Sequence, residues 1–110
     1  MFNASDFMKK LESIKIKAVV PFKSLIGEEI TIIDYVHMGG TLCPDGENFI
    51  NSIFVRILFY KNDNKDEIML TNTSSELVVA RLWSSPFFKL PLKVKVIKNN
   101  RYYDLKLLGS

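Results

Sequence analysis

Apolar and basic residues alternate strictly near the end of the chain, over residues 91–98 and again over residues 101–107. Such alternation is typical of strands that bury one face, and the Asn99-Asn100 pair between the two segments predicts a hairpin with a two-residue turn. One face of this hairpin is apolar. The other face is cationic and carries an aromatic ring; it consists of Lys93, Lys95, Tyr102 and Lys106, with Lys98 and Arg101 near the turn and Asp104 as its one acidic residue.

Three further β-rich segments precede the hairpin, over residues 29–38, 49–60 and 67–71. They are rich in β-branched and aromatic residues, which favour strands. The middle segment is too uniformly apolar to divide into a buried and an exposed face. The sequence therefore predicts five strands in all, three before residue 72 and two after residue 90.

A helix is expected between the third and fourth of these strands. Thr73-Ser74-Ser75-Glu76 matches the capping-box pattern, in which the Thr73 hydroxyl accepts a hydrogen bond from the N–H of Glu76. The helix should end at Ser84-Ser85-Pro86, because proline cannot continue it.

The N-terminal segment predicts a second short helix and an extended lead-in. Ser5 or Asp6 could cap a helix running to about Ser13, and residues 14–20 alternate as a strand would. This lead-in could pair within the domain or with a second chain, so the oligomeric state stays open.

The order of these elements is that of a small β-barrel. Three strands, a helix and a two-stranded hairpin match the five-stranded OB barrel, in which a helix lies between strands three and four. We expect an all-β fold with one or two short helices in a single OB-type domain, with residues 1–18 as the N-terminal helix and lead-in strand and residues 19–108 as the barrel.

Composition agrees with one globular domain. The chain has 110 residues, of which 47% are hydrophobic, and its formal net charge is +3. That charge permits an anionic partner without requiring one, so any attraction for such a partner must come from local clustering of lysine and arginine.

The expected compartment is the cytoplasm, which would be that of the host cell if a phage encodes the protein. The single cysteine, Cys43, excludes an internal disulfide framework and a four-cysteine zinc site. No apolar run is long enough to predict a membrane span, and Met1–Asp6 lacks the basic start of a signal peptide.

Catalysis has little support in the sequence. His37 is the only histidine, and acid–base catalysis needs a positioned partner beside it. Cys43 lies six residues away, but nothing in the pattern requires the two side chains to meet. Gly39-Gly40 is not followed by the Gly-Lys-Ser/Thr run of a phosphate loop. We therefore expect no enzymatic activity, no metal, no cofactor and no small-molecule substrate.

Binding of single-stranded nucleic acid is better supported. Proteins of this class combine a cationic groove for phosphates with aromatic rings on which bases stack. Trp83 and Tyr103 are also candidates for stacking, but a core position is favoured for both, Trp83 as a lid at a helix end and Tyr103 on the apolar phase of its strand. The candidates for phosphate contacts are Lys15, Lys17, Arg56, Lys93, Lys95, Arg101 and Lys106, and those for stacking are Tyr35, Phe54, Tyr60 and Tyr102.

Several short segments also resemble a known family. Leu25–Tyr35, the capped helix after Thr71–Ser75, the Leu90-Pro91 entry to the fourth strand and Arg101–Leu105 together look like small single-stranded-DNA-binding proteins of phages and mobile elements of Gram-positive bacteria. The resemblance covers about residues 19–108. It implies an OB fold, no catalysis, and protection of single-stranded DNA in replication, recombination or transfer.

Three departures and two alternatives accompany that resemblance. The net charge of +3 is low for a dedicated strand binder. Bacterial housekeeping single-strand binders typically end in an acidic tail, whereas this sequence ends Leu108-Gly109-Ser110, so recruitment of partners through such a tail is not expected. The helix predicted over residues 5–13 lies outside the resemblance. The same domain could instead dock a replication or phage-assembly partner through aromatic residues such as Phe87 and Phe88, or inhibit a host enzyme. DNA and RNA are not distinguished at this stage.

Overall fold

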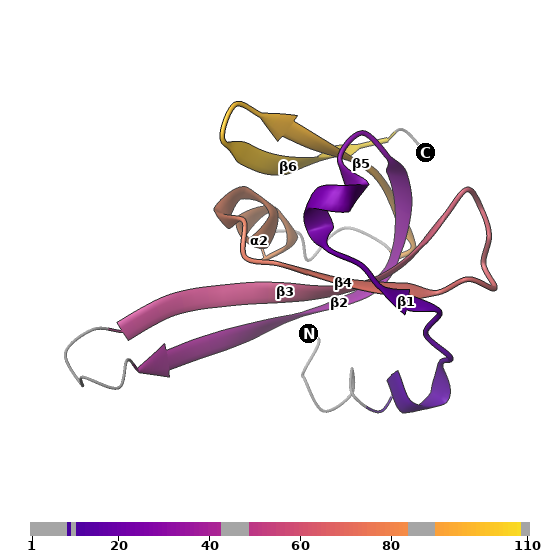
Figure 1. Ribbon diagram of the computed structural model, residues 1–110, viewed down its shortest axis with the longest axis horizontal. Helices are drawn as coiled ribbons and strands as arrows, with labels where there is room; N and C mark the ends of the chain where they lie inside the picture. Colours follow the sequence, from indigo (N-terminus) through magenta and orange to yellow (C-terminus); the bar gives the residue numbers. More distant parts are fainter. Residues whose placement is uncertain (1–8, 10, 43–48, 84–89, 109–110) are drawn as a thin grey trace.

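The computed structural model describes residues 9, 11–42, 49–83 and 90–108. Figure 1 shows a twisted sheet whose strands cross near the middle of the molecule, with one helix packed beneath the C-terminal hairpin. The elements are β1 (Ala18–Val19), the 3-10 helix η1 (Phe22–Leu25), β2 (Glu29–Leu42), β3 (Phe49–Lys61), β4 (Met69–Thr73), α2 (Glu76–Trp83), β5 (Leu92–Asn99) and β6 (Tyr102–Leu107).

The strands form one six-stranded sheet in the order β1-β4-β3-β2-β5-β6. All neighbouring strands are antiparallel except β1 and β4, which are parallel. The long strands β2 and β3 continue beyond their neighbours as a two-stranded arm (Figure 1). The all-β class and the predicted succession of strands around the helix are thus confirmed.

The predicted closed barrel is not confirmed, and the sheet is open. Within the described residues, β6 pairs with β5 alone, and the second neighbour of β4 is β1. The lead-in therefore pairs within the chain: the N–H of Lys17 donates to the carbonyl of Ile68 at 2.7 Å, and that of Val20 donates to the carbonyl of Leu70 at 2.9 Å. Residues 9 and 11–13 are helical, as predicted, and the rest of the helix expected over 5–13 lies outside the described residues.

The main core lies on the inner face of the curled sheet. The inward side chains of β2, β3 and β5 meet Val78 and Leu82 of α2 and Phe22 and Leu25 of η1. Since α2 places Val78 and Leu82 four residues apart, both side chains point to the same face of the helix. This packing fixes α2 beside the hairpin, where it shapes the candidate site.

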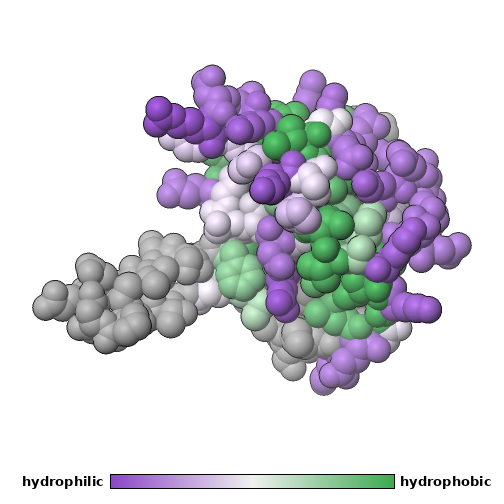
Figure 2. All heavy atoms as spheres, viewed as in Figure 1, coloured by the Kyte–Doolittle hydropathy of each residue, from purple (hydrophilic) through white to green (hydrophobic). Residues whose placement is uncertain are grey.

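A second, smaller apolar cluster lies on the outer face of the sheet. Val36, Leu58 and Leu70 form its buried centre, and Ile14 and Ile16 of the lead-in pack on it. Figure 2 shows apolar residues reaching the surface around the position of β1, with hydrophilic side chains bordering them. The alternation of residues 14–17 therefore leaves the isoleucines half-buried and Lys15 and Lys17 exposed.

Three local predictions need correction. Strand β4 begins at Met69 instead of residue 67, and the arm carries β2 to Leu42, beyond the predicted strand end at residue 38. The hairpin turn is Asn100-Arg101, one residue later than predicted, because Asn99 still pairs with Tyr102. Asn100 adopts a φ of 56°, a conformation that asparagine tolerates better than most residues.

The start of α2 also differs from the predicted capping box. The Thr73 hydroxyl accepts a hydrogen bond from the N–H of Ser75 at 3.2 Å, instead of from Glu76. The carbonyl of Ser75 accepts from the N–H of Val79 at 2.9 Å, so Ser75 is the residue that caps the helix. Thr73 is the last residue of β4, two residues before the cap of the helix.

Candidate nucleic-acid interface

The outer face of the β5–β6 hairpin carries the predicted cationic residues. Residues directly paired across antiparallel strands share a face, and Lys95 pairs with Lys106 while Asn99 pairs with Tyr102. Lys93 and Lys106 are exposed, and Lys95 is half-buried. The alternation in the sequence thus predicted the two faces of the hairpin correctly.

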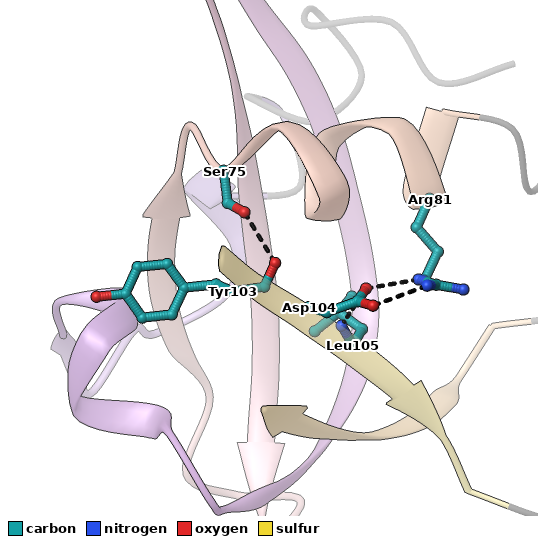
Figure 3. Close-up of polar contacts among 5 residues, drawn as sticks. All are labelled: Ser75, Arg81, Tyr103, Asp104 and Leu105. Atoms are coloured by element: carbon teal, nitrogen blue, oxygen red, sulfur yellow. Dashed lines mark hydrogen bonds and ion pairs between the residues drawn. The ribbon is translucent and has the colours of Figure 1, made fainter. Parts of the chain in front are cut away.

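The acidic residue of this face is bound by a cation from α2. The guanidinium of Arg81 donates to both carboxylate oxygens of Asp104, at 2.7 and 2.8 Å (Figure 3). These hydrogen bonds, with a further one from the N–H of Leu105, hold the pKa of Asp104 below its usual value, and the Asp104 carboxylate in turn raises the pKa of Arg81. Asp104 therefore stays ionised and paired at neutral pH.

A second contact fastens α2 to the hairpin. The Ser75 hydroxyl donates to the carbonyl of Tyr103 at 3.0 Å (Figure 3). That carbonyl lies on the edge of β6 away from β5. The helix thus covers a sheet edge that would otherwise expose unpaired backbone groups.

The pairing of Asp104 changes the charge of the hairpin face. Lys93, Lys95, Arg101 and Lys106 contribute four positive charges, and Arg81 cancels the one negative charge of Asp104, so the face carries four net positive charges. Two acidic residues of neighbouring elements border it. Glu29 of β2 pairs with Lys95 across the sheet, and the Asp63 carboxylate lies 3.8 Å from the Lys93 ammonium.

Only some of the predicted stacking rings are accessible. Tyr102 is 57% exposed on the cationic face, which suits a stacking role. Tyr35 is 8% exposed and Tyr60 is 6% exposed, so neither presents an open ring face as the sequence prediction required. The hydroxyl of Tyr35 donates to the carbonyl of Leu82 at 3.1 Å. Burial raises the pKa of the Tyr35 hydroxyl, and the negative charge of Asp34 raises it further by a smaller amount. Tyr35 therefore belongs to the core.

The remaining predicted site residues lie on elements other than the hairpin. Arg56 is half-buried on β3, and its guanidinium donates to the Asn72 side chain at 3.2 Å. Lys15 is exposed on the lead-in, and Lys17 forms an ion pair with Glu67. Phe54 is half-buried on the arm. The structure does not join these residues to the hairpin face through any direct contact among the described residues.

The ring of Trp83 is exposed, although the sequence favoured a core position over a stacking role for it. We expected it to cover the core, but it is 69% exposed at the end of α2. Its ring meets that of His37 edge-on, with centroids 4.9 Å apart, and His37 Nε2 lies 3.0 Å from the carbonyl of Val79. The helical periodicity of the sequence could have predicted this exposure, because Trp83 is one residue beyond buried Leu82 and so does not lie on the buried face of α2.

The other groups considered from the sequence are the metal-ligating side chains, His37 and Cys43. No three His, Cys, Asp or Glu side chains gather there as a metal ion would need. His37 is held between Tyr35 and Trp83, and Cys43 lies outside the described residues. No helix of the described residues is long and apolar enough to cross a membrane.

Comparison with known proteins returns no match, whether the chain is compared with protein-family models, with curated proteins or with solved structures. The candidate interface therefore depends on the geometry and charge of this chain alone.

Proposed function

We propose that this protein binds single-stranded DNA without sequence preference, through the outer face of the β5–β6 hairpin. The observation that carries the proposal is the ion pair between Arg81 and Asp104, because it cancels the one acidic charge of the hairpin's own residues and leaves lysines and arginine around an exposed tyrosine. Phosphates would contact Lys93, Lys95 and Lys106, and a base would stack on Tyr102.

The proposal extends to the fold and the biological setting. The order β4-β3-β2-β5-β6, with α2 between β4 and β5 along the chain, is compatible with an OB-type sheet in which β4 and β6 do not pair to close the barrel. A protein of this kind would protect single strands in the cytoplasm during phage or mobile-element replication, recombination or transfer. Binding by phosphate contacts and stacking requires no catalytic group.

A titration of fluorescently labelled oligo-dT, followed by anisotropy at two salt concentrations, tests this function. Affinity should fall with salt, with a log–log slope of roughly −0.7 for each phosphate contact. Duplex DNA of the same length should bind much more weakly, because its bases cannot stack on Tyr102. Absence of binding to the single strand at low salt would contradict the proposal.

A protein-docking function is the second candidate, and the exposed side of α2 favours it. Leu77 is 41% exposed and Trp83 is 69% exposed on this helix. The affinity of an apolar docking surface for a protein partner should be nearly insensitive to salt. The same titration, repeated with a protein partner in place of oligo-dT, therefore distinguishes the two functions. Phe87 and Phe88, which the sequence suggested for docking, lie outside the described residues.

A further inference from the structure

A pocket of about 500 Å³ opens on the outer face of the sheet. Its lining combines an aromatic ring, aliphatic side chains and one lysine, namely Tyr60, Ile33, Ile68, Leu90, Pro91 and Lys65. Pockets that bind small ligands are mostly apolar, have volumes of this order and contain a few polar groups that orient the ligand.

A β-bulge contributes one wall of this pocket. In the pairing of β2 with β3, Ile32 lies opposite Phe59 and Asp34 lies opposite Leu58, so Ile33 is an extra residue without a partner. An extra residue of this kind bends the strand and redirects its side chain. The half-buried Ile33 therefore does not occupy a regular position in the sheet, and its side chain lines the pocket.

The pocket continues the cationic hairpin face. Thr31 of β2 pairs with Tyr60 on one side and with Lys93 on the other, so these three residues form one row across the outer face. Neighbouring strands lie about 4.8 Å apart, which places the Cα atoms of Lys93 and Tyr60 roughly 10 Å from each other. A ligand that spans the two sites needs to be no longer than one or two nucleotides.

Two lysines flank the acidic residue at the turn between β3 and β4. The N–H of Lys65 donates to the carbonyl of Asp63 at 3.0 Å, and the Lys93 ammonium lies 3.8 Å from the Asp63 carboxylate. Both members of that ion pair are more than half exposed, so the pair contributes little and can open for a stronger anion. No ion pair involves Lys65 within the described residues.

We infer that this pocket receives one base of the bound strand, whose phosphates contact Lys65 and Lys93. A nucleotide joins a flat apolar ring to an anion over a short distance, which matches the apolar lining of the pocket beside two lysines. A purely apolar occupant would leave Lys65 without an anionic partner. This inference rests on the proposed function, because it assigns a second base site for the same strand that stacks on Tyr102.

Methyl NMR on the full chain tests the inference. The methyl groups of Ile33, Ile68 and Leu90 are observed during titration with oligo-dT and with an abasic strand of the same length, while anisotropy reports total binding. Oligo-dT should shift these methyl signals, and the abasic strand should leave them in place. Lys65→Glu should weaken the binding of oligo-dT about fivefold more than Lys23→Glu, a matched charge reversal on η1 outside the pocket.

The outcomes separate the inference from the function. If oligo-dT binds by anisotropy while the three methyl signals stay in place, the pocket assignment is wrong and the proposed function stands. The same conclusion follows if the abasic strand shifts the methyl signals equally. If oligo-dT does not bind at all, both the function and the base site are wrong.

Discussion

The guanidinium of Arg81 on α2 binds both carboxylate oxygens of Asp104 on β6, at 2.7 and 2.8 Å. The Asp104 side chain is 12% exposed and that of Arg81 is 44% exposed, so the carboxylate is the desolvated partner. Bidentate pairs of this geometry are stronger than single hydrogen bonds between neutral groups. The contact therefore links the helix to the hairpin and sets the charge of the proposed binding face.

Replacing Arg81 by alanine should destabilise the fold. The substitution leaves the Asp104 carboxylate desolvated without its cation. Loss of hydrogen bonds to a charged group should lower the free energy of unfolding by about 1.5–3 kcal/mol. Urea unfolding followed by circular dichroism measures the change. Arg101→Ala, at the exposed hairpin turn, is the matched control and should change stability by less than about 0.5 kcal/mol. Equal effects of the two variants would contradict the role given to the Arg81–Asp104 pair.

The same pair predicts a dependence of stability on pH. Because Arg81 lowers the pKa of Asp104 in the folded state, this carboxyl contributes stability that is present above its unfolded pKa, near 3.9, and is lost as the pH falls through the lower folded value. The free energy of unfolding should therefore decrease below about pH 4. Asp104→Asn should remove this part of the decrease, and an unchanged pH profile in that variant would show that other carboxyls are responsible.

Tyr102 should contribute to strand binding through its ring. Stacking is worth roughly 1–3 kcal/mol per base, so Tyr102→Ala should weaken the binding of oligo-dT by about 5- to 150-fold. Tyr102→Phe keeps the ring and should keep most of the affinity. Anisotropy titrations of both variants measure the effect, and a comparable loss in the two variants would assign the contribution to the hydroxyl instead.

Tyr35 should contribute to stability alone. Tyr35→Phe removes the hydrogen bond to the carbonyl of Leu82 and should cost about 0.5–1.5 kcal/mol. Strand affinity should be unchanged because the ring is buried. Urea unfolding and an oligo-dT titration on the same variant test both statements. A tenfold loss of affinity without a loss of stability would mean that Tyr35 takes part in strand binding.

Asp63 should act against binding. It is paired with Lys93 at 3.8 Å and exposed, so Asp63→Asn frees that lysine at little cost to the fold. Asparagine also tolerates the φ of 56° found at this position. Affinity for oligo-dT should rise about two- to fivefold at low salt, and the gain should disappear at high salt as charges are screened. A decrease in affinity would mean that Asp63 holds Lys93 in the productive position.

Local sequence patterns predicted the parts of the structure that depend on local rules. The two faces of the hairpin follow from strict alternation. The succession of strands along the chain follows from β-rich segments separated by polar turns. The turn between β3 and β4 lies in the polar interval between two of the predicted strands, and its residues Asn62 and Asp63 both have positive φ, as a tight turn of this kind requires. The hairpin turn was misplaced by one residue because Asn99 and Asn100 have equal turn preferences.

Non-local contacts could not be predicted in this way. Arg81 and Asp104 are 23 residues apart, and only the packing of α2 against β6 brings them together. The burial of Tyr60 was not predictable either, because its segment is uniformly apolar and gives no phase for its faces. The bulge at Ile33 adds one residue to β2 and creates part of a pocket that no sequence motif announces.

Charge reversal on the hairpin tests the central claim most directly. Lys93→Glu with Lys95→Glu should weaken oligo-dT binding at least tenfold at low salt, while circular dichroism and urea unfolding show an intact fold. Lys9→Glu with Lys23→Glu changes the net charge equally at exposed sites outside the hairpin and should have a much smaller effect. If the two double variants lose affinity equally, or if neither loses any, the outer face of the β5–β6 hairpin is not the surface that binds the strand.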